Sequence, residues 1–130
     1  MENNMELALY RLARAKEELS ASELLYKGNF YKSANNRAYY SIFHAIRAVF
    51  SLENKDFKRH KDVVAYFNKN YINKEVFPRN LGKKIVVARD IREESDYDDE
   101  FVVSPEETLA QMETAKYLID LVEQYLLDRS

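Results

Sequence analysis

The scarcity of glycine and proline restricts the fold of this chain more than any other feature of its sequence. Only 2 Gly and 2 Pro occur in 130 residues. Sheets and Gly-rich phosphate loops need more turn residues than this, so the chain has few places at which to break a helix. We therefore predict an all-α fold, an up-and-down antiparallel four-helix bundle with an additional short helix, in a single domain over residues 1–130.

The charge balance and the missing cysteines exclude several classes of function. Lys and Arg total 20 against 22 Asp and Glu, so the net charge is −2 and any contact with nucleic acid has to be local. The absence of cysteine excludes disulfides, thiolate nucleophiles and Cys-ligated zinc. No stretch approaches the ~18 consecutive apolar residues of a membrane span, and no signal-peptide pattern is visible. We expect a cytoplasmic protein that makes no membrane contact.

Apolar spacing predicts two long helices joined by a very short link. The first covers about residues 4–26, and its apolar seam alternates intervals of three and four residues. The seam consists of Met5, Ala8, Leu12, Ala15, Leu19, Ser22 and Tyr26. We expect Gly28 to end this helix with a positive φ and Asn29 to cap a second helix over about 30–52.

The middle of the chain is predicted to contain one short helix and one long helix. A polar loop at 53–58 precedes the short helix, which we place at about 59–71. Proline suits the first turn of a helix, so we expect Pro78 to open the next helix, which runs through about Glu94.

The C-terminal part combines an acidic run with a clear helix start. The run EESDYDDE at 93–100 carries six carboxylates and is typical of a solvated loop. Ser104 and Glu107 match a capping box, with Pro105 at the first helical position between them. The last long helix is therefore predicted to begin there.

The second helix gathers its polar residues into one stripe. At 100° per residue, five of them fall within about 100° of the helix circumference. They are Asn36, Arg37, Tyr40, His44 and Arg47. The remaining arc is mostly apolar, so we expect this to be the central helix of the bundle. Its rings Tyr39, Phe43 and Phe50 are then core or dimer-interface residues.

Arg37 and His44 are the residues of the stripe most suited to chemistry. They lie two turns apart on one face, too far to bond to each other along the helix. They can flank a common ligand or meet a second copy of themselves across a dimer. The planar guanidinium suits phosphate, and an imidazole accepts and returns a proton near neutral pH. Nearby arginines favour the neutral imidazole, and Tyr40 offers a ring on which a base can stack.

Three segments together carry a family resemblance: LLYKGNFYKSANNRAYYSIFHAIRAVF, RHKDVVAYF and ARDIREESDYDDEFVVSPEE. The chain resembles the HEPN family (higher eukaryotes and prokaryotes nucleotide-binding) over about residues 7–126. With its RAYYxxFH core and R-x6-H spacing, it is most similar to small stand-alone prokaryotic members. The resemblance implies a four-helix bundle that is commonly a homodimer.

Many HEPN members are metal-independent endoribonucleases, and the resemblance implies Arg37 and His44 as catalytic residues at a dimer cleft. Asn36, Tyr40 and Arg47 then contact RNA or a nucleotide. Prokaryotic members are often encoded beside a minimal nucleotidyltransferase, as toxin and antitoxin, which implies an antitoxin-like partner here. Some related toxins carry a tyrosine that the partner modifies with AMP two residues beyond the His. Ile46 occupies this position, so we do not expect that control.

The chemistry that follows needs no metal and no cofactor. We expect His44 to take the proton from a ribose 2′-OH while Arg37 and Arg47 stabilise the charge on the phosphorane. A second His44 from the partner subunit protonates the leaving 5′ oxygen. Two alternatives stay open: a non-catalytic module that binds nucleotides or recruits a nucleotidyltransferase, and a purely structural helical dimer. Ala38 keeps the first alternative open, because ribonuclease members often have a polar residue there.

Two further features favour structural explanations. The basic run at 58–61, which contains His60, is more typical of a solvated helix start than of an RNA-contacting surface. Asp96 and Tyr97 follow Arg92 in the family's spacing, and we expect them to lock a helix to the neighbouring loop.

Overall fold

The structure, a computed structural model, describes residues 2–130, with side chains from Asn4 onward. Its α-helices are α1 (Glu2–Lys27), α2 (Tyr31–Leu52), α3 (His60–Phe67), α4 (Arg79–Tyr97) and α5 (Pro105–Leu127). A π-helical segment, η1 (Asn68–Ile72), continues α3 directly. Residues 2–130 contain no strand, which confirms the all-α prediction. None of the helices in this range combines the length and apolarity needed to cross a membrane.

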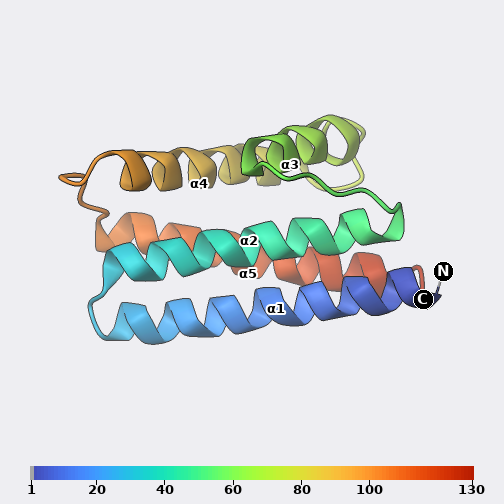
Figure 1. The fold of residues 1–130 in the computed structure, drawn as a ribbon, viewed down its shortest axis with the longest axis horizontal. Coiled ribbons are helices and arrows are strands. Elements are labelled where there is room, and N and C mark those ends of the chain that lie inside the picture. The colour runs from blue at the N-terminus through green and yellow to red at the C-terminus, as the bar shows by residue number, and fades with distance from the viewer. Residues whose placement is uncertain (1) are drawn as a thin grey trace.

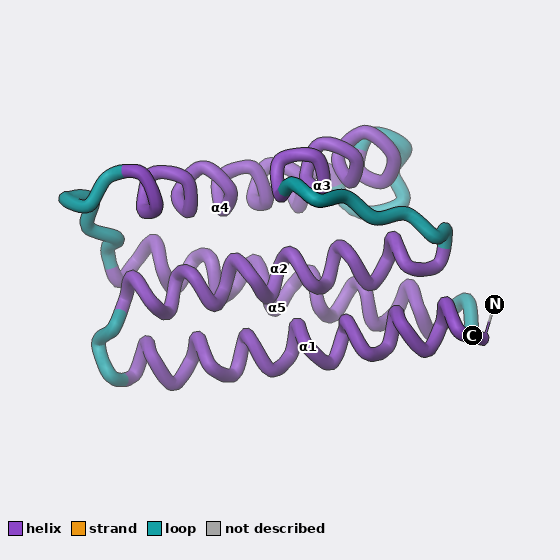
Figure 2. The backbone as a smooth tube through the Cα atoms, viewed as in Figure 1, coloured by secondary structure: helices purple, strands orange, loops and turns teal. Residues whose placement is uncertain are grey.

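The four long helices alternate in direction and form a bundle with α2 at its centre (Figure 1). More than half of the residues of α2 are buried, because it packs against α1, α5, α4 and α3. The loops lie at the two ends of the bundle, and α3 with η1 is the additional short segment (Figure 2). The prediction of an up-and-down bundle with a central second helix is confirmed.

The link between α1 and α2 differs from the prediction at both of its residues. Asn29 has the positive φ of 67°, and Gly28 does not. Asn29 also does not cap α2, whose N-cap is Phe30 without a side-chain cap. The Asn29 N–H donates to the carbonyl of Tyr26 (3.0 Å). The Phe30 N–H donates to the carbonyl of Leu25 (2.9 Å), which completes a Schellman motif with Asn29 as its left-handed residue.

The third long helix, α4, begins and ends later than predicted. Pro78 is its N-cap rather than part of its first turn. The helix continues through Tyr97, so the prediction of a loop was wrong for residues 93–97. Arg92 forms an ion pair with Asp96 one turn later (3.3 Å), and Ser95 is buried against the bundle. Because Asp96 is inside the helix, the predicted lock between helix and loop was also wrong.

The start of α5 is as predicted. The Glu107 N–H donates to Oγ of Ser104 (3.0 Å), and the Ser104 N–H donates to Oε1 of Glu107 (3.1 Å). Pro105 occupies the first helical position, where its missing N–H costs nothing. The capping box therefore fixes where the chain re-enters the bundle after the acidic segment.

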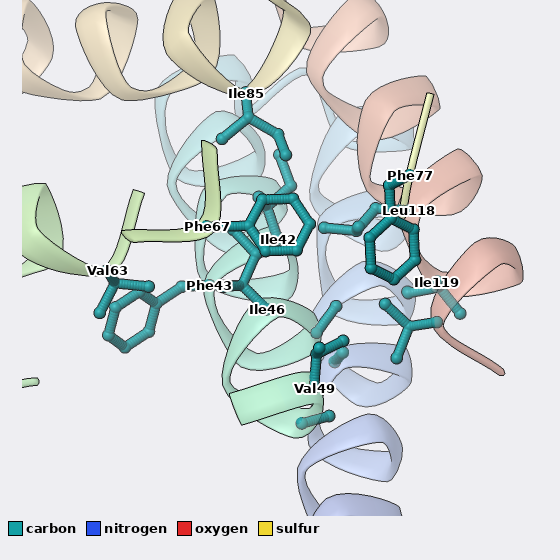
Figure 3. Packing of buried hydrophobic residues seen from close by; sticks show 14 of the residues in the cluster. Ile42, Phe43, Ile46, Val49, Val63, Phe67, Phe77, Ile85, Leu118 and Ile119 are labelled. Carbon is teal, nitrogen blue, oxygen red and sulfur yellow. The ribbon is translucent and has the colours of Figure 1, made fainter. Parts of the chain in front are cut away.

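The core combines aliphatic and aromatic side chains from all five α-helices and from η1. Figure 3 shows this convergence, with Ile42, Val63, Ile85 and Leu118 each contributed by a different helix. The rings expected in the core are all buried there: Tyr39, Phe43 and Phe50. Phe50 is completely buried among four further rings, at centroid distances of 5.2 to 6.4 Å.

Candidate functional site

Close packing of α1 against α2 brings the polar edges of the two helices together. Ser22 of α1 donates to the carbonyl of Ala34 (2.6 Å), and Ser41 of α2 donates to the carbonyl of Ala15 (2.7 Å). Around these bonds the small side chains of both helices are completely buried: Ala8, Ala15, Ala34, Ala38, Ala45 and Ala48. Side chains on the adjacent edges of α1 and α2 therefore reach across to one another, and they form the candidate site.

The first predicted catalytic residue, Arg37, is held by a carboxylate of α1. Its Nη1 lies 3.0 Å from Oε2 of Glu18. Glu18 is only 8% exposed and also pairs with Arg14, whose Nη2 lies 3.6 Å from Oε1. The Arg37 guanidinium lies over the Tyr40 ring, 5.1 Å from its centroid. The Arg37 side chain is still 38% exposed, so the ion pair does not bury it.

The second predicted catalytic residue, His44, is half-buried among arginines. Burial lowers its pKa below the usual value, and the positive charge of Arg14 acts in the same direction. Glu18 opposes this shift, while Arg47 and Arg11 add to it. The lowered pKa favours the neutral imidazole, the direction expected from nearby arginines. The arginines responsible include two from α1, and Arg37 is not among the causes.

Arg47 belongs to a network that ties the 53–59 loop to the two helices. It binds Asp56 with two parallel bonds, Nε to Oδ1 (3.1 Å) and Nη2 to Oδ2 (2.7 Å). Arg11 of α1 joins them, with Nη2 3.4 Å from Oδ2 of Asp56 and Nη1 2.9 Å from Oγ of Ser51. Burial alone would raise the pKa of Asp56, but the bonds from Arg47 and from the Phe57 N–H outweigh it and lower that pKa.

Tyr40 connects the stripe to α4 and α3. Its hydroxyl accepts a bond from Nη2 of Arg92 (3.3 Å), and the His60 ring meets it edge-on at 5.7 Å. His60 also stacks on Phe43, with 4.1 Å between the ring centroids, and its Nδ1 is buried without a partner. The basic run 58–61 is a helix start whose lysines and Arg59 are exposed, as expected, and only His60 departs from that interpretation by turning inward. Asn36 is half-buried at the edge of the stripe.

The structure thus brings together four of the five predicted site residues and adds four that sequence reasoning missed. The additions are Arg11, Arg14, Glu18 and Asp56. On α1, the spacing of residues 11, 14 and 18 places three charged side chains on one face beside the apolar seam, and this signal was available. Asp56 lies in a loop, and no periodicity could have assigned it.

The fold and the stripe define a class of protein: an all-α bundle whose central helix presents an R-x6-H pair beside the arginines of a neighbouring helix. The family model described as "HEPN domain" matches residues 8–125 of this chain. The chain therefore belongs to the HEPN family.

Proteins from two organisms show similarity over much of their length. One protein of Methanocaldococcus jannaschii named "putative toxin" is 28% identical over 119 residues, which cover 92% of this chain and 81% of that protein. A second with that name is 32% identical over 83 residues, covering 64% of this chain and 62% of that protein. A "UPF0332 protein" of Thermotoga maritima is 27% identical over 128 residues, covering 98% of this chain and 97% of that protein.

Proposed function

We propose that this protein is a toxin-type HEPN endoribonuclease that cuts RNA in the cytoplasm without a metal ion or cofactor. The observation that carries the proposal is His44, a half-exposed imidazole with arginines of two helices around it, whose pKa is lowered by burial and by those arginines. A neutral imidazole can accept a proton, and guanidinium groups suit the phosphate beside it. The similarity to two proteins named "putative toxin" supports a role of the same kind.

The reaction is a transesterification within the RNA. His44 takes the proton of a ribose 2′-OH, and the freed oxygen attacks the adjacent phosphorus. Arg37 stabilises the charge on the phosphorane, with Arg47 as a second cation. The P–O5′ bond then breaks, and His44 of the partner subunit gives its proton to the leaving 5′ oxygen. Because the His44 pKa is lowered in both subunits, only the dimers in which that second imidazole is protonated react. The products are a 2′,3′-cyclic phosphate and a 5′ hydroxyl.

A homodimer supplies the second imidazole. Leu7 and Tyr10 lie one helical turn before Arg11 and Arg14 and so share their face of α1. Both are exposed apolar side chains beside the polar stripe of α2. Apolar groups next to a charged site favour contact with another protein surface, and a second copy of this face would bring two His44 residues toward one cleft.

Cleavage assays with structured and unstructured RNA in EDTA test the proposal. Wild type is expected to cleave, and both Arg37→Ala and His44→Ala are expected to lose cleavage. Arg59→Ala is the matched control, because Arg59 is an exposed arginine that pairs with Asp62 and not with a carboxylate of the site. Equal cleavage by wild type and His44→Ala would contradict the proposal.

A second candidate function is binding without turnover. In it, the stripe holds RNA or a nucleotide, and the protein recruits a minimal nucleotidyltransferase as an antitoxin-like partner. Arg37 is paired with Glu18, and Arg47 is paired with Asp56. These pairings favour this candidate, because each carboxylate offsets positive charge that would otherwise stabilise the phosphorane. Binding that is lost in Arg37→Ala, with no cleavage by wild type, would establish it in place of the nuclease.

A further inference from the structure

Two carboxylates on the α1–α2 face are each held by one arginine from α1 and one from α2. Glu18 lies between Arg14 of α1 (3.6 Å) and Arg37 of α2 (3.0 Å). In the same way, Asp56 lies between Arg11 of α1 (3.4 Å) and Arg47 of α2 (2.7 Å). The arrangement is thus repeated along the two helices. We call Arg14 with Arg37, and Arg11 with Arg47, the two arginine pairs.

The two arginine pairs lie on either side of His44. Because α1 and α2 run antiparallel, Arg11 meets Arg47 toward one end of the face, and Arg14 with Glu18 reaches Arg37 toward the other. Along α2, Arg37 and Arg47 are ten residues apart, a rise of about 15 Å. His44 lies between them, nearer to Arg47.

We propose that the two arginine pairs are phosphate subsites for single-stranded RNA, one on each side of the bond positioned at His44. Arg11 and Arg14 of α1 then bind the phosphates before and after the scissile one. Arg47 and Arg37 of α2 each bridge one of these phosphates and the scissile phosphate, which keeps their role in the proposed reaction. This inference rests on the proposed function and adds the course of the bound strand, which runs along the seam between α1 and α2. A planar guanidinium binds phosphate in the fork geometry it uses for a carboxylate.

The two carboxylates play different roles because they differ in exposure. Glu18 is 8% exposed and fixed on α1, so it positions Arg37 and Arg14, whose side chains are 38% and 40% exposed. Asp56 has a side chain that is 49% exposed on a loop. It competes directly with an incoming phosphate for Arg47 and leaves when the phosphate binds.

Binding of a short single-stranded RNA tests the subsites, with 2′-O-methyl riboses so that the 2′ oxygen cannot attack. Affinity is measured by fluorescence anisotropy over a series of salt concentrations. Arg14→Ala is expected to weaken binding and to reduce the slope of log affinity against log salt by about 0.7, the value of one phosphate contact on a single strand. Asp56→Asn is expected to tighten binding several-fold.

Arg59 and Asp62 provide controls matched in charge, since they form an exposed ion pair on α3 and its N-cap. If Arg14→Ala binds like Arg59→Ala, or Asp56→Asn binds like Asp62→Asn, the subsite inference is overturned. Arg37→Ala separates this failure from failure of the proposed function. Loss of binding in Arg37→Ala with an unaffected Arg14→Ala refutes the subsites alone. If wild type and Arg37→Ala bind equally and also cleave unmodified RNA equally, the proposed function fails as well.

Discussion

Along α2, the flank that faces α1 and the flank that faces α3 and α4 differ in the size of the side chains they bury. Toward α1, alanines and two serine-to-carbonyl bonds fill the contact. Toward α3 and α4, the contact is made by rings, among them Phe43 stacked on His60 and Phe50 against Tyr66. The first is the alanine flank and the second is the ring flank.

The difference explains where the candidate site lies. On the alanine flank the helix backbones approach closely, so long side chains at the edges of α1 and α2 meet over a narrow seam. Arginines of both helices therefore converge on shared carboxylates. On the ring flank the rings fill a wider space, and Arg92 makes cation–π contacts with the faces of Tyr39 and Tyr40. Shortening a buried side chain should therefore lower the free energy of unfolding most on the ring flank. Enlarging one should lower it most on the alanine flank.

The largest effect is expected from Phe50→Ala on the ring flank. Phe50 is fully buried among rings that cannot collapse into the space it leaves, so we expect a loss of about 3–5 kcal/mol in the free energy of unfolding. Urea denaturation followed by circular dichroism measures this. Phe30→Ala is the control, because Phe30 is exposed and should change stability by less than about 0.5 kcal/mol. Similar losses in both variants would contradict the ring-flank interpretation.

Ala45→Leu tests the alanine flank by the opposite change. Ala45 is completely buried and lies one turn after Ser41, on the side facing α1. Three additional carbons should force the helices apart and lower the free energy of unfolding by about 1–3 kcal/mol. The same substitution at Ala13, which is exposed on α1, provides the comparison. If thermal melting shows no difference between the two variants, α1 and α2 are not closely packed.

Gly82→Ala examines a close contact behind the ring flank, where α4 meets η1. A Cβ at Gly82 would lie 2.8 Å from Cγ2 of Ile72, whereas alanine favours a helix by about 1 kcal/mol over glycine. We expect overpacking to exceed this gain and leave a net loss of about 1 kcal/mol. In an Ile72→Ala background the loss should disappear, which a double-mutant cycle by urea denaturation would show. Stabilisation by Gly82→Ala alone would contradict this.

Local sequence signals were sufficient for most of the fold. The capping box at Ser104 and the arc of apolar residues on α2 depend on neighbours within a turn or two, so the sequence alone specifies them. Gly28 and Asn29 could both adopt a left-handed conformation, and the choice depends on which carbonyls of the last turn accept bonds. The acidic run at 93–97 is helical because Ser95 packs against the bundle, which composition does not reveal.

The candidate site was only partly predictable. Arg37 and His44 share a face of one helix, so periodicity alone brings them together. Arg11 and Arg14 reach the same surface through the register between α1 and α2, set by contacts such as Ser41 to the Ala15 carbonyl. That register is a tertiary property. For the same reason, the sequence could not predict that the loop residue Asp56 joins the site.

The smallest expected effect is on the pH dependence of the free energy of unfolding. It compares the two flanks through His44 on one side and His60 on the other. Burial, the largest cause, lowers the pKa of both His44 and His60. Arg92 and Arg47 lower the pKa of His60 further, and Asp96 opposes them. The unfolded chain therefore binds more protons below about pH 6.5 than the folded chain does, so stability is full above that pH and falls as pH decreases.

His60→Phe keeps a ring against Phe43 but removes the titrating group. We expect the free energy of unfolding of this variant to fall less than that of wild type between pH 7 and pH 5.5, a range above the titration of most carboxylates. His44→Gln should flatten the profile in the same way on the other side of α2. Urea denaturation at several pH values measures both slopes. Identical slopes in wild type and both variants would show that neither imidazole is kept neutral by the fold, and the general-base role of His44 would lose its physical basis.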